Sequence, residues 1–144
     1  YWTVDLSQSV VVRACWDGGS PNIFIDNVLK TAQAYKDSQD KNVLANFAWK
    51  FVPVDGKEGW YRILDVKTGT YLTVNGNGYT INGAALIGGD DDTQLFKLKE
   101  VGLNRFKIEG KYGKLLTVHD VTLDTYMWED HSHDMQYWYF ESLA

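Results

Sequence analysis

The segment 135–140, MQYWYF, places four aromatic rings in a row after a single Gln, near the C-terminus of a 144-residue chain. Two related phrases occur earlier, NFAWKF at 46–51 and DTQLFKL at 92–98. Each phrase contains an aromatic anchor that is followed, after one intervening residue, by an apolar side chain; the anchors are Trp49, Phe96 and Trp138. A phrase that recurs three times at similar intervals indicates an internal repeat, and such a repeat decides the fold.

Hairpins precede two of the anchors. The stretches GWYRILDVKTGTYLTVN (59–75) and NRFKIEGKYGKLLTVH (104–119) each contain a short strand, a Gly-containing turn and a second strand, which is a hairpin signature. At the start of the chain, WTVDL (2–6) followed by VVVRA (10–14) is a degraded version of this hairpin. The third strands of the three units are expected near 30–36, within 79–88 and within 122–129.

Three units of four short strands predict an all-β chain that forms a single β-trefoil domain over 1–144, with repeats at about 1–54, 55–101 and 102–144. In a trefoil the hairpins close a barrel and cap it, so few sheet edges stay exposed. The one helical candidate, 27–37, is short and interrupts the repeat. The alternative is another all-β sandwich or barrel.

Specific side chains of the repeated phrase have expected structural roles. The three anchor rings should point into the barrel and form its core. Gln94 and Gln136 each stand two residues before an anchor, and we expect their side chains to tie the preceding loop through hydrogen bonds. Asn46 is a shifted counterpart in the first unit.

The composition excludes several classes of protein. Hydrophobic residues make up 44% of the chain, so it can bury a core and is not disordered. The net charge is −5 and the 14 Lys and Arg are scattered, which argues against nucleic acid and against insertion into an anionic membrane. Cys15 is the single cysteine, and no signal-peptide pattern opens the chain. These features favour a cytoplasmic location over secretion, since disulfides are typical of secreted domains.

No catalytic or metal-binding motif is present, so we expect no enzyme activity, cofactor or metal. There is no G-x-S-x-G elbow, and the nearest His to Cys15 along the chain lies in a distant unit. The Gly-rich stretch 75–89 lacks the Lys and the helix start of a phosphate loop. His131 and His133 form an i,i+2 pair, which is weak support for zinc because zinc needs three or four converging ligands.

The recurring Q-x-[WF] phrase resembles the ricin-B-like family of lectins. EGWYRILDVKTGTYLTV, NRFKIEGKYGKLLTV and TYMWEDHSHDMQYWYFES are similar, more narrowly, to the sugar-binding module of fungal haemolytic pore-forming lectins. The resemblance covers most of 45–144 and is weaker over 1–44. It implies a β-trefoil lectin, or haemagglutinin, that binds glycans with terminal galactose-type sugars. A pore-forming module follows the trefoil in that toxin family, and pore formation is not carried over here.

In ricin-B-like lectins each unit can hold one sugar, between the end of its second strand, its third strand and the loop before its fourth. An aromatic ring stacks on the apolar face of the sugar, while carboxylate, amide and imidazole groups bind its hydroxyls. The resemblance makes the third unit the best site. Its candidate residues are His119, Asp120, Tyr126, Trp128, Glu129, Asp130 and His131, with His133 further along the loop.

Strand alternation refines this expectation. Tyr126 and Trp128 share one face of their strand and Met127 takes the other, so one ring should stack on the sugar and the other should support it. The second unit offers Asn75, Tyr79 and Asn82, in a hairpin expected to be two residues longer than its counterpart. Small residues replace the Trp-Glu-Asp of the third unit there, so this site depends on Tyr79 replacing the missing ring.

Further candidates are scattered in the first unit, where we expect no site: Arg13, Trp16, Asp17 and Tyr35. Two other functions compete with sugar binding. A trefoil protease inhibitor would use the long insertion 15–29 as a protruding loop, and a cytoskeletal or protein-binding trefoil is compatible with the turn phrase TGTYLTVNGNG. A shallow sugar pocket binds weakly, so a lectin of this kind would need several sites or a homo-oligomer for useful avidity.

Overall fold

The computed structural model describes residues 5–15, 23–25, 32–34, 45–88, 91–119 and 125–143, and within these ranges it contains strands and short 3-10 turns but no α-helix. The strands are β1 (Val10–Ala14), β2 (Ile23–Ile25), β3 (Ala32–Ala34), β4 (Trp49–Val54), β5 (Lys57–Asp65), β6 (Tyr71–Val74), β7 (Ile81–Ala84), β8 (Phe96–Gly102), β9 (Arg105–Glu109), β10 (Leu115–Val118), β11 (Thr125–Trp128) and β12 (Trp138–Ser142). The 3-10 turns are η1 (Ala45–Phe47), η2 (Lys111–Gly113) and η3 (Asp134–Gln136).

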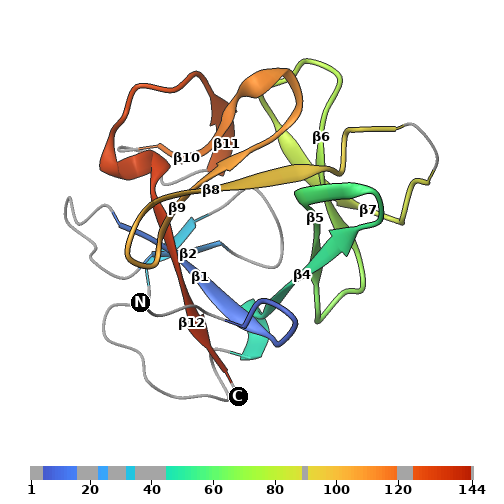
Figure 1. Ribbon diagram of the computed structural model, residues 1–144, viewed down its shortest axis with the longest axis horizontal. Coiled ribbons are helices and arrows are strands. Elements are labelled where there is room, and N and C mark those ends of the chain that lie inside the picture. Colours follow the sequence, from blue (N-terminus) through green and yellow to red (C-terminus); the bar gives the residue numbers. More distant parts are fainter. Residues whose placement is uncertain are drawn as a thin grey trace.

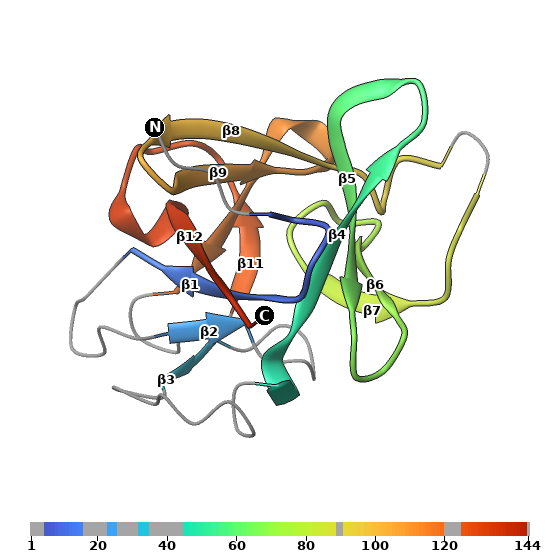
Figure 2. The same ribbon diagram turned by 60° about the horizontal axis from the view of Figure 1, so that its bottom comes forward.

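Six of the strands form a closed antiparallel barrel. β1 pairs with β4, β4 with β5, β5 with β8, β8 with β9, β9 with β12, and β12 pairs again with β1. Figure 1 shows the blue strand β1 beside the red strand β12, so the two ends of the sheet meet. Figure 2 shows β4 beside β5 and β8 beside β9, the pairs that join one unit to the next.

Three hairpins complete the fold. β2–β3, β6–β7 and β10–β11 are attached to β1, β5 and β9 respectively, so each unit contributes four strands. A six-stranded barrel with three attached hairpins is a β-trefoil, and the predicted all-β fold is therefore confirmed. Strand β3 lies inside the segment 27–37, where the sequence has its one helical candidate, and in the region where the third strand of the first unit is expected.

The three anchor rings form the centre of the core. Trp49, Phe96 and Trp138 are the first residues of β4, β8 and β12, and each is fully buried. The indole N–H of Trp138 donates a hydrogen bond to the carbonyl of Leu116 at 2.9 Å, so its polar atom is satisfied, as a buried donor requires. The predicted inward orientation of the anchors is confirmed.

The two glutamines hold equivalent loops in the second and third units. Oε1 of Gln136 accepts the N–H of His131 at 2.8 Å, while its Nε2 donates to the carbonyl of Glu129 at 2.6 Å and to Oγ1 of Thr117 at 3.3 Å. Gln94 makes the same three bonds with Ile87, Ala85 and Thr73, at 2.9, 2.9 and 3.1 Å. The predicted loop tethering by both side chains is confirmed.

The assignment of strands in the first unit differs from the one expected from the sequence. VVVRA at 10–14 is the first strand of its unit, not the second, because Val10 pairs with the anchor Trp49 just as residues of β5 and β9 pair with the anchors Phe96 and Trp138. All five residues of β1 are buried. The run of three valines at 10–12 suits a barrel strand that is covered on both faces, and it carries no alternation to distinguish the two assignments. Arg13, which follows it, is buried and pairs with Glu141 at 3.0 Å.

The second strand of the first unit is β2, which lies within the segment 15–29 that reads as an insertion in the sequence. β2 pairs with β1 at Arg13 and Phe24, and with β3 along its length. At least this part of the segment therefore belongs to the repeat. Residues 16–22 and 26–31, together with the side chain of Asn46, lie outside the described residues.

Gly110 packs closely against two core side chains, Met127 and Phe96. A Cβ atom at this position would lie 2.8 Å from Cε of Met127 and 3.0 Å from Cε2 of the anchor Phe96. Gly110 itself has extended backbone angles, with φ −109° and ψ −157°, which alanine also adopts. The contact, not the backbone conformation, therefore selects glycine.

Gly110→Ala should lower the free energy of unfolding by about 1–3 kcal/mol, because the added methyl overpacks a buried site. Gly76→Ala is the matched control: no atom lies within 4 Å of its Cβ position, and its φ is not positive. Urea denaturation of the two variants and the parent chain measures both changes. An unfolding curve of Gly110→Ala that overlays the parent's would contradict the packing described here.

Candidate functional site

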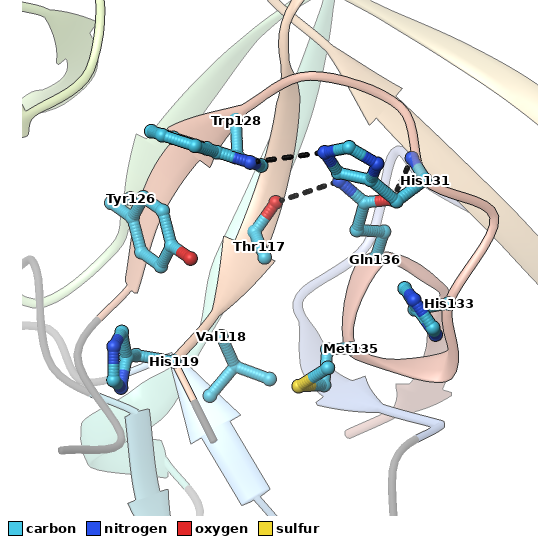
Figure 3. Close-up of a pocket in the computed structure, with 9 residues that line it drawn as sticks. All are labelled: Thr117, Val118, His119, Tyr126, Trp128, His131, His133, Met135 and Gln136. Atoms are coloured by element: carbon cyan, nitrogen blue, oxygen red, sulfur yellow. Dashed lines mark hydrogen bonds between the residues drawn. The ribbon is translucent and has the colours of Figure 1, made fainter. Parts of the chain in front are cut away.

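A cavity of about 180 Å³ lies in the third unit, between the β10–β11 hairpin and the loop that leads into β12. Figure 3 shows Tyr126 and Trp128 on one side, His131 and His133 on the other, and Val118 and His119 toward the lower end. The residues that line it are Thr117, Val118, His119, Tyr126, Trp128, His131, His133, Met135 and Gln136. The structure thus brings together five of the candidate residues, which are His119, Tyr126, Trp128, His131 and His133.

The alternation of β11 presents two rings to the cavity. Thr125 and Met127 are buried in the core, whereas Tyr126 is half-buried and Trp128 is exposed. The ring centroids of Tyr126 and Trp128 are 5.9 Å apart with an interplanar angle of 63°, and His119 lies 6.0 Å from Tyr126. Three rings therefore form a continuous wall in which Tyr126 occupies the middle.

The indole of Trp128 is fixed although 38% of its surface is exposed. Its Nε1 donates to Nε2 of His131 at 3.1 Å. The backbone N–H of His131 is in turn held by the buried amide of Gln136. A chain of hydrogen bonds therefore runs from the core to the exposed ring, which reduces the conformational entropy that a ligand would otherwise have to remove.

Other predicted residues of the third unit lie outside the cavity lining. Glu129 is exposed and supplies its backbone carbonyl to Gln136. Asp130 pairs with Lys107, with Oδ2 and Nζ 2.7 Å apart, and accepts the N–H of Ser132 at 2.9 Å. Asp120 lies outside the described residues. The carboxylate of Asp130 thus shapes its loop instead of facing the cavity.

Several lining residues were not among the predicted ones. Thr117 stands two residues before His119 on the same strand face, so strand alternation alone could have found it. Gln136 was assigned only to loop tethering, yet the same side chain forms part of the cavity wall. Met135 and Val118 add an apolar end that no sequence pattern indicates.

The second unit has the same framework without the rings. The β6–β7 and β10–β11 connections comprise residues 75–80 and 119–124, so they are equal in length and the expected two-residue extension is wrong. Asn82 pairs with Thr73 as Tyr126 pairs with Thr117, and Ala84 and Ile87 hold the positions of Trp128 and His131. Asn75 binds Oγ1 of Thr80 within its own turn, at 2.7 Å.

Tyr79 does not replace the missing ring of the second unit. Its ring centroid lies 5.4 Å from that of Trp128, and its backbone carbonyl accepts the N–H of Met127 at 2.7 Å. Both contacts are with β11 of the third unit, so Tyr79 packs beside the third-unit cavity without lining it. The expectation that Tyr79 completes a second-unit site is not met, because the turn that carries Tyr79 packs against β11 of the third unit.

Among the described residues, no group of three or more His, Cys, Asp and Glu is arranged to hold a metal ion. Within the same ranges, no helix has the length and apolar character needed to cross a membrane.

Known structures similar to this chain include β-trefoils, whereas no protein-family model and no curated protein matches its sequence. A designed threefold-symmetric protein, ThreeFoil, is 18% identical, with a TM-score of 0.68 over 92% of this chain and 96% of that one. The Polyporus squamosus lectin, bound to the human-type influenza-binding epitope Neu5Aca2-6Galb1-4GlcNAc, is 20% identical, with a TM-score of 0.75 over 97% of this chain.

A third similar structure is 1,3Gal43A, an exo-beta-1,3-galactanase from Clostridium thermocellum, which is 21% identical with a TM-score of 0.69 over 98% of this chain. This chain spans half the length of the Polyporus lectin and 31% of the galactanase. At these identities the similarity establishes the fold, and the function must be argued from the cavity itself.

The pairing of Asp130 with Lys107 should be visible in a titration. The ammonium of Lys107 and the N–H of Ser132 stabilise the charged carboxylate, so the pKa of Asp130 lies below its usual range, and the pKa of Lys107 is raised in turn. A lowered carboxyl pKa contributes stability that is present at neutral pH and is lost as the pH falls through that pKa. NMR titration of Asp130 should give a low midpoint.

Lys107→Met should move the titration midpoint of Asp130 upward, toward the usual range, because the main stabilising partner is removed. Lys99→Met is the control, since Lys99 pairs with Glu109 and not with Asp130. A midpoint that stays where it was in Lys107→Met would show that the ion pair does not hold this loop.

Proposed function

We propose that this chain is a carbohydrate-binding module of the ricin-B-like lectin type, without catalytic activity, and that it binds galactose-type glycans in the third-unit cavity. One observation carries the proposal: the exposed ring of Trp128 is fixed beside a cluster of imidazole, hydroxyl and amide groups. This combination suits a sugar, which presents an apolar face and several hydroxyls to its receptor.

The contacts assign a role to each ring. Trp128 is exposed and held by His131, so it is the ring that stacks on the apolar face of the sugar. Tyr126 is half-buried between His119 and Trp128 and supports the indole. His119 and His133 provide ring nitrogens for hydrogen bonds to the sugar. The hydroxyl of Thr117 donates to the carbonyl of Leu115 and accepts from Gln136, so it forms part of the cavity wall. The role of Asp120 stays a prediction from the sequence.

The size of the cavity supports a small ligand. Its volume of about 180 Å³ is below the usual range for drug-sized pockets, which suits one sugar residue of a longer glycan. Such a site buries little surface and binds weakly. In the second unit Ala84 and Ile87 stand at the positions of Trp128 and His131, so these positions carry no ring. Avidity would therefore come from a homo-oligomer or from a larger assembly rather than from a second site of this kind on the same chain.

Two of the similar structures add support from outside the chain. The Polyporus squamosus lectin binds a glycan that contains galactose, and 1,3Gal43A is a galactanase. Both activities belong to those proteins. They favour galactose-type glycans as the first ligands to test, and they favour sugar binding over a protease inhibitor or a cytoskeletal protein.

Retention on lactosyl-agarose with elution by free lactose tests the proposal. Trp128→Ala should weaken lactose binding by about tenfold or more, because it removes both the stacking surface and the partner of His131. Ile87→Ala is the matched control: Ile87 occupies the position of His131 in the second unit and makes the equivalent backbone bond. This variant should bind lactose like the parent chain.

Isothermal titration with lactose gives the affinities of both variants. Unchanged binding by Trp128→Ala would place the sugar elsewhere on the chain. Absence of binding to every glycan on an array, combined with inhibition of a protease, would contradict the lectin proposal altogether.

A further inference from the structure

A second set of aromatic and cationic side chains lies next to the cavity, and the site described above does not use it. Tyr79, on the turn between β6 and β7, packs against Trp128 with ring centroids 5.4 Å apart. The ammonium of Lys114 lies 4.8 Å from the ring centroid of Tyr79 and 5.5 Å from that of Tyr112. We call Tyr79, Tyr112 and Lys114 the cationic rim.

The rim is continuous with the wall of the cavity. Lys114 directly precedes Leu115, and Leu115 pairs with Trp128 across the β10–β11 hairpin. Tyr112 belongs to η2, and its ring meets the Gly78–Tyr79 turn so closely that a Cβ on Gly78 would lie 3.0 Å from Cδ2 of Tyr112. The two units therefore meet along this line, and Trp128 both lines the cavity and contacts the rim.

The two tyrosines of the rim are exposed, and no carboxylate of the described residues pairs with the ammonium of Lys114. Tyr79 is 39% exposed and Tyr112 is 62% exposed. The neighbouring Lys111 pairs with Asp92 at 3.2 Å. In contrast, none of the carboxylates in the described parts of the chain lies within 4 Å of the Lys114 ammonium. An ammonium fixed between two rings in a chain of net charge −5 is a local feature that favours an anion.

We propose that the cationic rim is a subsite for a carboxylate-bearing sugar, such as a sialic or uronic acid, attached to the galactose-type residue held in the cavity. The carboxylate would pair with the ammonium of Lys114, and the apolar face of the acidic sugar would lie on Tyr79 or Tyr112. The inference rests on the proposed function, because the rim alone offers one charge and an open surface. It makes acidic glycans the preferred ligand class.

Isothermal titration of the parent chain with lactose, sialyllactose and a glucuronylated lactose tests the inference and separates the two acidic sugars. An acidic ligand should bind about two- to fivefold more tightly than lactose, the size expected of an exposed ion pair. The advantage should shrink as NaCl is raised, because salt screens exposed charges. Lactose affinity should change little over the same salt range.

Lys114→Met keeps the length and apolar contacts of the side chain and removes its charge. It should reduce the affinity for the acidic ligand to that for lactose and leave lactose binding unchanged, whereas Lys114→Arg should keep the preference. Lys57→Met, at an exposed position on β5, removes the same charge away from the rim and should leave the preference intact.

Equal affinities of the parent chain for lactose and both acidic ligands would overturn the inference and leave the proposed function standing. A preference for the acidic ligand that survives in Lys114→Met would also overturn it. If the parent chain binds none of the three ligands, the proposed function fails and the rim loses its role with it.

Discussion

The buried amide of Gln136 is the constraint on which the site depends. It joins the hydroxyl of Thr117, the carbonyl of Glu129 and the backbone N–H of His131, so one buried side chain links β10 to the loop before β12. By fixing the loop it places the imidazole of His131 against the indole of Trp128. Gln94 applies the same constraint in the second unit. The framework is therefore common to both units, and only the side chains placed on it differ.

The sequence predicts the fold well because the repeated phrase combines features with a fixed structural meaning. An aromatic anchor two residues after a Gln sits at the start of a barrel strand, and the hairpins follow from Gly turns and alternation. The place of the third-unit site was implied by the resemblance to ricin-B-like lectins, and strand alternation added that Tyr126 and Trp128 share a face. These are local relations that one strand or one turn decides.

Relations between distant residues were not predictable. All five residues of VVVRA are buried and show no alternation, so its place as the first strand of its unit is decided by pairing with β4 and β12 and not by its own pattern. The carboxylate of Asp130 could accept hydrogen bonds from sugar hydroxyls, but it forms an ion pair with Lys107 on β9. Tyr79 belongs to the second unit by sequence, and only the packing of the two units reveals that its ring contacts Trp128 of the third unit. In each case a contact between residues that are distant in sequence overrides the local signal.

The contact of Tyr79 with Trp128 crosses a repeat boundary and limits what a symmetric trefoil can reproduce. The β6–β7 and β10–β11 connections are equal in length, so the position of Tyr79 in the second unit corresponds in sequence to Leu123 in the third. A chain assembled from three copies of the third unit would carry three sets of cavity residues but would have leucine, not tyrosine, at this sequence position of every unit. The aromatic surface at Trp128 thus combines side chains of two dissimilar neighbouring units.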